Sequence, residues 1–201
     1  MSRARVRPRL IAITDLSVAP AELLVARLGG LVASAAPGSV MLQLRDRALP
    51  IRERALLGER LARVARASGQ LFAVNDRVDL AMLLGADAVH LGEASMDADA
   101  ARRLAGPELF VSRAVHEPSA PALGADALVL SPIAAPRKGR PALGVAALSA
   151  RSDALVYALG GVDAATARAC LDAGATGVAV IGAVLDGRPV EPLLDALGIR
   201  R

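Results

Sequence analysis

The rarest polar residues of this chain follow or interrupt short apolar segments. Asn75, the only asparagine, comes directly after the apolar run 71–74, and Asp76 follows it. His90, one of only two histidines, lies within the run 88–91. An amide, a carboxylate and an imidazole can hydrogen-bond a ligand, exchange a proton or, for the carboxylate, bind Mg²⁺. These positions are therefore the first candidates for chemistry, although any one of them could simply meet solvent.

The same arrangement recurs along the sequence. The apolar runs 10–13 and 41–44 also end in polar residues, and the only lysine lies in a proline-rich stretch near the middle of the chain. If the runs are parallel strands, their carboxyl ends share one face and bring these residues together. The candidate set is Gln43, Arg45, Asn75, Asp76, His90, Glu93, Arg113, His116, Ser131 and Lys138.

Two glycine turns indicate a phosphate site. Gly160-Gly161 follows the apolar run 155–159, and Gly182 follows Ile181 at the end of the run 177–181. Glycine lets the backbone approach an anion closely, and backbone N–H groups at a helix start bind phosphate. The last two strand-to-helix loops of a barrel commonly do this. The alternative is that both are ordinary turns, whereas Asp76 could serve either as a Mg²⁺ ligand or as a helix cap.

The elements that must position these residues alternate between strand and helix. Short β-prone runs bounded by glycine or polar residues predict strands near 9–13, 39–44, 71–74, 88–91, 109–111, 127–130, 155–159 and 177–181. The segments between them predict helices near 20–28, 50–67, 78–84, 97–104, 118–123, 145–150, 164–172 and 192–197. Gly29-Gly30 is expected to end the first helix, and Asp97 to cap the fourth.

Eight alternations predict a (β/α)₈ TIM barrel that forms a single domain over residues 1–201. The longest irregular stretch, 131–144, is expected to be a functional loop. An open doubly wound sheet is the alternative architecture. It would normally carry a glycine-rich turn after its first strand, where this chain has Thr14-Asp15.

Composition narrows the class of protein. Hydrophobic residues make up 54% of the 201 residues, which excludes a disordered chain, but only 1% are aromatic. The net charge of +4 comes mostly from arginine, which we interpret as compositional bias, since almost no aromatic side chain is present to stack on bases. A single cysteine, Cys170, excludes a disulfide framework. No run approaches the length of a membrane span, and we expect a cytoplasmic protein without nucleic-acid or membrane partners.

These residues make the chain resemble the thiamine phosphate synthase/TenI superfamily of small barrels over about residues 10–185. The order and spacing of six segments carry the resemblance: Ile11-Ala12-Ile13-Thr14-Asp15, Gln43-Leu44-Arg45-Asp46, Val74-Asn75-Asp76-Arg77-Val78-Asp79-Leu80-Ala81, Gly85-Ala86-Asp87-Ala88-Val89-His90-Leu91-Gly92, Ala158-Leu159-Gly160-Gly161-Val162 and Gly177-Val178-Ala179-Val180-Ile181. For the synthase, the resemblance implies joining a pyrimidine diphosphate to a thiazole phosphate, with Mg²⁺-diphosphate leaving. It implies pyrimidine and diphosphate contacts for Gln43, Arg45, Asn75 and Lys138, and a metal contact for Asp76.

The chain departs from the synthase pattern in three places. Ser95 stands where the resemblance leads us to expect a second metal-binding aspartate. The loop that is threonine-rich in the synthase has no threonine over residues 131–138. Residues 112–116, Ser-Arg-Ala-Val-His, are similar to the Gly-Arg-Ser-Val-His stretch of TenI-type members, whose histidine is linked to thiazole tautomerisation.

The third departure favours the tautomerase branch, with His116 and Arg45 as catalytic residues acting on a thiazole carboxylate phosphate. The tautomerase would need no cofactor, whereas the synthase, which is the first alternative, would use Mg²⁺ at Asp76. A non-catalytic phosphate-binding regulatory barrel is the second alternative. A homo-oligomer is left open. The predicted substrate- and phosphate-binding residues are Gln43, Asn75, His90, Arg113, Lys138, Gly160, Gly161, Ile181 and Gly182.

Overall fold

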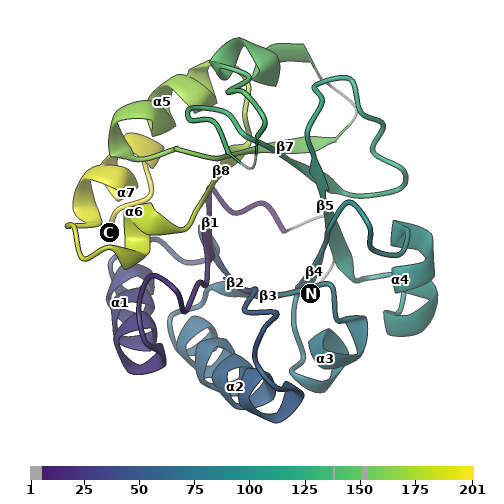
Figure 1. Cartoon of the computed structure of the whole chain (residues 1–201). Helices are drawn as coiled ribbons and strands as arrows, with labels where there is room; N and C mark the ends of the chain where they lie inside the picture. Colours follow the sequence, from purple (N-terminus) through teal and green to yellow (C-terminus); the bar gives the residue numbers. More distant parts are fainter. Residues whose placement is uncertain (1–5, 138, 151–153) are drawn as a thin grey trace.

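The computed structural model describes residues 6–137, 139–150 and 154–201, and its strands close into a parallel barrel (Figure 1). Each strand pairs with the next one along the chain, and β8 pairs with β1. The TIM barrel predicted from the sequence is therefore confirmed. The strands are β1 (Leu10–Ile13), β2 (Val40–Leu44), β3 (Leu71–Asn75), β4 (Ala88–Leu91), β5 (Phe110–Val115), β6 (Ala127–Leu130), β7 (Leu155–Leu159) and β8 (Gly177–Val180).

The helices form an outer ring around the strands (Figure 1). They are α1 (Ala21–Ala33), α2 (Ile51–Ala67), α3 (Val78–Leu83), α4 (Ala98–Ala105), α5 (Ala164–Asp172), α6 (Gly182–Leu185) and α7 (Glu191–Leu197), with a 3₁₀ helix at Val145–Ala150. No helix in the described ranges is long and apolar enough to cross a lipid bilayer.

The alternation of side chains along each strand separates two cores. Residues such as Leu42, Leu44 and Val74 face outward and pack under the helices. The other set fills the barrel interior with apolar side chains that include Met41, Phe110 and Tyr157. Because successive side chains point to opposite faces, continuing the inward series toward the carboxyl ends places polar residues at the barrel mouth. These inward polar residues are Gln43, Asn75, His90 and Ser112, all buried.

The prediction that Gly29-Gly30 ends the first helix is wrong. Helix α1 continues through both glycines to Ala33. Each internal glycine costs about 1 kcal/mol relative to alanine. That cost is offset because Leu24, Leu28 and Leu31, spaced along one helix face, are all completely buried against the barrel.

The helix predicted at 118–123 is also absent, and turns fill this part of the ring on the upper right of Figure 1. Pro118 and Pro121 remove backbone donors, and Leu123 adopts a positive φ of 49°. The preceding strand is longer than predicted: β5 runs to Val115, which pairs with Leu130 of β6. By contrast, Asp97 caps α4 as expected, its carboxylate accepting a hydrogen bond from the N–H of Ala100 at 2.6 Å.

Candidate active site

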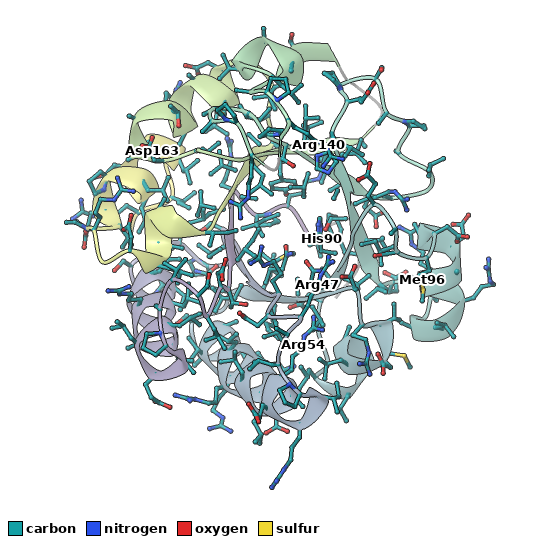
Figure 2. All side chains as sticks on the ribbon, viewed as in Figure 1. Arg47, Arg54, His90, Met96, Arg140 and Asp163 are labelled. Carbon is teal, nitrogen blue, oxygen red and sulfur yellow. The ribbon has the colours of Figure 1, made fainter. Side chains whose placement is uncertain are left out.

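A cavity of about 550 Å³ opens at the carboxyl ends of the strands. Asn75 and Gly160, which come from opposite sides of the barrel, both line it, as the predicted mouth requires. Figure 2 shows His90 and Arg47 within the ring of strands and Arg140 on the side of β5 and β7. The predicted residues that line this cavity are Gln43, Arg45, Asn75, Asp76, His90, Glu93, His116, Ser131, Gly160 and Ile181.

Three neighbouring side chains form a hydrogen-bonded relay across β2 and β3. The Nε2 group of Gln43 donates to Oδ1 of Asn75 at 3.0 Å, and Nδ2 of Asn75 donates to Oδ2 of Asp76 at 2.7 Å. From α2, the buried Arg54 donates to the backbone oxygen of Asn75 at 2.6 Å. Each amide is thereby held in one orientation. Buried polar groups that are hydrogen-bonded to one another in this way fix the shape of a site.

Asp76 is the most heavily bonded residue of the cavity. Its Oδ1 accepts from the N–H of Gly92 at 3.0 Å and from the hydroxyl of Ser95, and its Oδ2 forms a 2.7 Å ion pair with Arg47 in addition to the bond from Asn75. Burial raises the pKa of Asp76, but the Ser95 and Gly92 hydrogen bonds and the Arg47 charge outweigh burial, so the pKa lies below its usual value. The group is a carboxylate at neutral pH.

The backbone of Asp76 is unusual as well. Its φ is 64°, a left-handed conformation that non-glycine residues seldom adopt. The Asp76 N–H donates to the backbone oxygen of His90 at 2.8 Å, which anchors this conformation to β4. Asp76 does not cap α3, whose N-cap residue is Arg77. The capping alternative for Asp76 is therefore wrong.

His90 is buried on β4 between Asn75 and Ser112 of the neighbouring strands. Its Nδ1 lies 2.9 Å from the hydroxyl of Ser112. Burial lowers the pKa of His90 to about 4, with a smaller lowering by Arg47 and an opposing rise from Asp76. The imidazole is consequently neutral at physiological pH, and it meets a ligand as a hydrogen-bonding group without charge.

His116 follows β5 at the cavity edge, where the sequence predicted it. Its Nδ1 lies 2.7 Å from the backbone oxygen of Ser131, so Nδ1 must carry the proton and donate it. In the neutral ring, Nε2 is then the basic nitrogen, and it lies 3.7 Å from the carboxylate of Glu93. Arg140, from the loop after β6, pairs with the same carboxylate at 3.3 Å.

Two other predicted residues do not join the cavity in the expected way. Arg113 lies on β5 and lines a separate hollow of about 450 Å³ outside it, which also contacts His116 and Glu93. Lys138 lies outside the described residues. Arg45 does line the cavity, but its guanidinium is paired with Asp15 at 2.7 Å.

The two glycine turns lie together in a smaller adjoining hollow of about 210 Å³, which shares Gly160 and Ile181 with the main cavity. Gly161 and Gly182 both line it. The latter is the first residue of α6, a one-turn helix that the sequence did not predict.

Several functional candidates were missed in the sequence. Arg47 follows Arg45 by two residues, the spacing that returns a side chain to the same side of an extended chain, and this signal could have identified it. Arg54 and Arg188 carried no such signal, because they come from a helix and from the loop after α6. The missed residues are Arg47, Arg54, Arg137, Arg140 and Arg188.

The donor set around Asp76 does not fit Mg²⁺. The four accepting positions of a carboxylate are taken by Gly92, Ser95, Asn75 and Arg47. Among the described residues, no three histidine, cysteine, aspartate or glutamate side chains gather in a way that could hold a metal. A metal here would have to displace these donors and approach a guanidinium.

Comparisons with known proteins point to one family. The TMP-TENI family, described as thiamine monophosphate synthase, matches residues 10–184. A protein from Gloeobacter violaceus named thiamine-phosphate synthase is 38% identical over 159 residues, which cover 75% of this chain and 47% of that protein. The chain therefore spans about half the length of that relative.

Other relatives match over more of their length. A thiamine-phosphate synthase of Roseiflexus sp. is 39% identical over 170 residues, covering 80% of this chain and 72% of that one. The solved structure of a thiamine phosphate pyrophosphorylase from Pyrococcus furiosus is 30% identical and has a TM-score of 0.80, covering 97% of this chain and 96% of the other.

Proposed function

Since the chain belongs to the thiamine monophosphate synthase family, we propose that it joins a hydroxymethylpyrimidine diphosphate to a thiazole phosphate to form thiamine phosphate. The names of its relatives carry this choice, and they favour the synthase over the tautomerase that the His116 motif favoured. In the reaction, a C–N bond forms between the thiazole nitrogen and the pyrimidine methylene carbon. The C–O bond to the diphosphate breaks, and its electron pair leaves with the diphosphate.

The relay at β2 and β3 is suited to the pyrimidine. Because Nε2 of Gln43 donates to Asn75, its Oε1 is left as an acceptor for an amino group on the ring. The hydrogen bond from Asn75 to Asp76 fixes the orientation of the Asn75 amide, and this amide in turn holds that of Gln43. Neither amide therefore needs to reorient when the substrate enters. Preorganised polar groups of this kind act without reorganisation during the reaction.

The diphosphate and the thiazole phosphate have separate anchors in this proposal. Arg45, beside the relay, is a cation within reach of the leaving diphosphate. Gly161 and Gly182 offer backbone groups to the phosphate of the thiazole in the adjoining hollow. Since the hollow shares Gly160 and Ile181 with the main cavity, the two substrates would meet at this border.

A thiazole tautomerase is the second candidate, and the geometry of His116 favours it. The imidazole has its basic nitrogen beside Glu93 at the cavity edge, as a proton shuttle needs. A non-catalytic barrel that binds phosphate ligands would use the glycine turns alone.

One assay separates these functions. The purified chain is mixed with hydroxymethylpyrimidine diphosphate and thiazole phosphate, and thiamine phosphate is measured by its conversion to fluorescent thiochrome. Product formation at a rate proportional to protein supports the synthase. No product, together with conversion of the thiazole carboxylate phosphate, would favour the tautomerase, and binding without turnover of either substrate would favour the regulatory barrel.

A further inference from the structure

Resting on the proposed function, we infer that this site binds a diphosphate without a divalent metal ion, and that Asp76 is the anchor of Arg47 rather than a metal ligand. These residues lie on the edge formed by the loops after β2, β3 and β4, where the donors around Asp76 do not match the needs of Mg²⁺.

The first observation is the saturation of Asp76. Mg²⁺ requires oxygen ligands in a near-ideal octahedron at about 2.0–2.1 Å and usually keeps several waters. Both oxygens of Asp76 already accept two hydrogen bonds each, one of them charge-assisted from Arg47 at 2.7 Å. Ser95 supplies one of these donors, so a hydroxyl that binds Asp76 stands where a second carboxylate would be needed.

The second observation is the crowding of these groups around Gly92. A Cβ atom built on Gly92 would lie 3.1 Å from Nη2 of Arg47, 3.3 Å from Oγ of Ser95 and 3.4 Å from Oδ1 of Asp76. These three groups therefore converge on Gly92 so closely that even a methyl group would press on them. A metal ion that entered between Asp76 and Gly92 would have to separate them.

The third observation is the charge of the cavity. Among its described lining residues, four are arginines, whereas two are carboxylates. When Asp15, which pairs with Arg45, is counted as well, the arginines still exceed the carboxylates by one. A Mg²⁺ cage needs the opposite balance, but a diphosphate anion is attracted by this one. The arginines are Arg45, Arg47, Arg137 and Arg140, and the carboxylates are Asp76 and Glu93.

Arg47 is the group best suited to bind the diphosphate oxygens that a metal ion would otherwise bind. Its side chain is 59% exposed, and only part of its guanidinium is engaged by Asp76, which is 23% exposed. The remaining N–H groups of Arg47 can form a fork to two diphosphate oxygens, while the ion pair holds the side chain at the cavity wall. Asp76 thus acts as a positioning residue through Arg47.

The primary test is a calorimetric titration of the full chain with inorganic pyrophosphate, once in EDTA and once in excess MgCl₂. We expect binding in EDTA to be at least as tight as in MgCl₂, because Mg²⁺ complexes pyrophosphate in solution and shields its charge from the arginines. Binding that becomes about tenfold tighter or more in MgCl₂, or saturable binding of MgCl₂ alone, would overturn the inference.

Two variants test the residues named. Arg47→Met should weaken pyrophosphate binding in EDTA by about 10–100-fold, the value of one charged hydrogen-bonding partner. Arg63→Met is the matched control, because Arg63 is an exposed arginine of α2 that lines an outer groove and does not line the cavity, and this variant should bind as the wild type does. Equal affinity of Arg47→Met and Arg63→Met would remove Arg47 from the site.

Ser95→Asp should make pyrophosphate binding dependent on Mg²⁺. With a second carboxylate beside Asp76, pyrophosphate binding should become tighter when MgCl₂ is added, in contrast to the wild type. A folded Ser95→Asp protein as insensitive to MgCl₂ as the wild type would contradict the role assigned to Ser95. The wild-type titration does not depend on the folding of this variant.

The outcome is separable from that of the proposed function. If thiamine phosphate formation stops in EDTA and returns with MgCl₂, the proposed synthase function is supported and this inference is overturned. Metal-independent pyrophosphate binding that requires Arg47, in a protein that makes no thiamine phosphate, would support the inference and overturn the synthase.

Discussion

The two sides of the barrel mouth present different kinds of chemistry to a ligand. At the β2–β4 edge the available groups are side chains: two amides, a carboxylate and an arginine that are joined to one another, and an imidazole that is bonded separately to Ser112. At the β7–β8 edge, Gly160, Gly161 and Gly182 expose backbone groups, and the arginines that line the same hollow, such as Arg188, come from other segments. The first edge depends on residue identity, whereas the second depends on the course of the chain.

This difference suggests how the site divides recognition. A ring with several distinct donors and acceptors needs side chains of matching chemistry, and in the proposed function the relay of Gln43, Asn75 and Asp76 would supply them. A phosphate is the same on many metabolites, and a glycine turn beside a helix start is sufficient to bind it. Substitutions at the two edges should therefore fail in different ways.

Asn75→Ala is expected to have the largest effect. It removes both the acceptor of Gln43 and a donor to Asp76, so the relay loses its middle member. Synthase turnover should fall by about 10²–10³-fold, the usual cost of losing one preorganised polar group. Steady-state assays of thiamine phosphate formation, normalised to the folded fraction, provide the measurement.

Gln70→Ala is the control for Asn75→Ala. Gln70 is also a buried amide, but it bonds the N–H of Val40 at 2.9 Å and the backbone oxygen of Ala36 at 3.0 Å, at the opposite end of the barrel. It should lose about 1–3 kcal/mol of stability and keep its turnover. Similar losses of turnover in both variants would mean that the relay acts only through stability.

Gly161→Val should have the next largest effect, on the backbone edge. A Cβ at Gly161 would lie 2.5 Å from Cβ and 2.7 Å from N of Ala135, and its φ of 73° disfavours a branched side chain. The loop after β6 must move, and the affinity for thiazole phosphate should fall by about 10²-fold. The barrel should still fold, because the turn lies outside both cores.

Gly182→Ala sharpens this result, since no atom lies within 4 Å of its added Cβ. Its affinity for thiazole phosphate, measured by calorimetry, should change by less than about tenfold. Equal losses in the two glycine variants would show that added bulk at the hollow matters and the course of the turn does not.

The backbone edge was also the more predictable one. The glycines after strand seven indicated a turn because conformation requires glycine there, and the structure gives both Gly160 and Gly161 a positive φ. Gly182, after strand eight, has no positive φ and no atom within 4 Å of an added Cβ, so conformation does not require glycine at that position. The eight strands were predictable for a related reason: their apolar runs are short and end in glycine or polar residues. A backbone conformation that requires a particular residue type can be predicted from that residue in the sequence.

The side-chain edge was only half predictable. The period of two along a strand identifies Gln43, Asn75 and His90 as inward residues, but their partners come from other elements. The pairing of Arg47 with Asp76, and the contact of Arg54 with the backbone of Asn75, depend on how loops and helices pack. The same dependence explains α1, where burial of Leu24 and Leu28 outweighs two glycines that local rules treat as a stop.

His116→Ala tests whether proton transfer belongs to the site. The C–N bond of thiamine phosphate forms without a proton moving, so synthase turnover should fall by less than about tenfold. Loss of the hydrogen bond to Ser131 should cost about 1 kcal/mol of stability, seen in thermal unfolding. A loss of about 10²–10⁴-fold in tautomerisation of the thiazole carboxylate phosphate, in a wild type that performs it, would instead assign His116 the acid–base role.

His90→Gln should have the smallest effect at neutral pH and a visible one in acid. The folded barrel keeps His90 neutral down to about pH 4, because burial lowers its pKa from 6.5. An unfolded chain binds the proton near pH 6.5, so wild-type stability is complete above that pH and falls as the pH drops from 6.5 toward 4. Between pH 7.5 and 5 this amounts to about 2 kcal/mol, measured by urea unfolding.

Titration of the neighbouring carboxylate, Asp76, does not affect this measurement. The pKa of Asp76 lies below its usual value, so the stability that Asp76 contributes is retained at pH 5 and is lost only in stronger acid. His90→Gln should therefore lose about 2 kcal/mol less than the wild type over this interval. Parallel losses in the two proteins would mean that His90 becomes charged inside the folded barrel. The side-chain edge would then gain a cation at pH 5, whereas the described residues that line the hollow of the backbone edge include no histidine that could respond in this way.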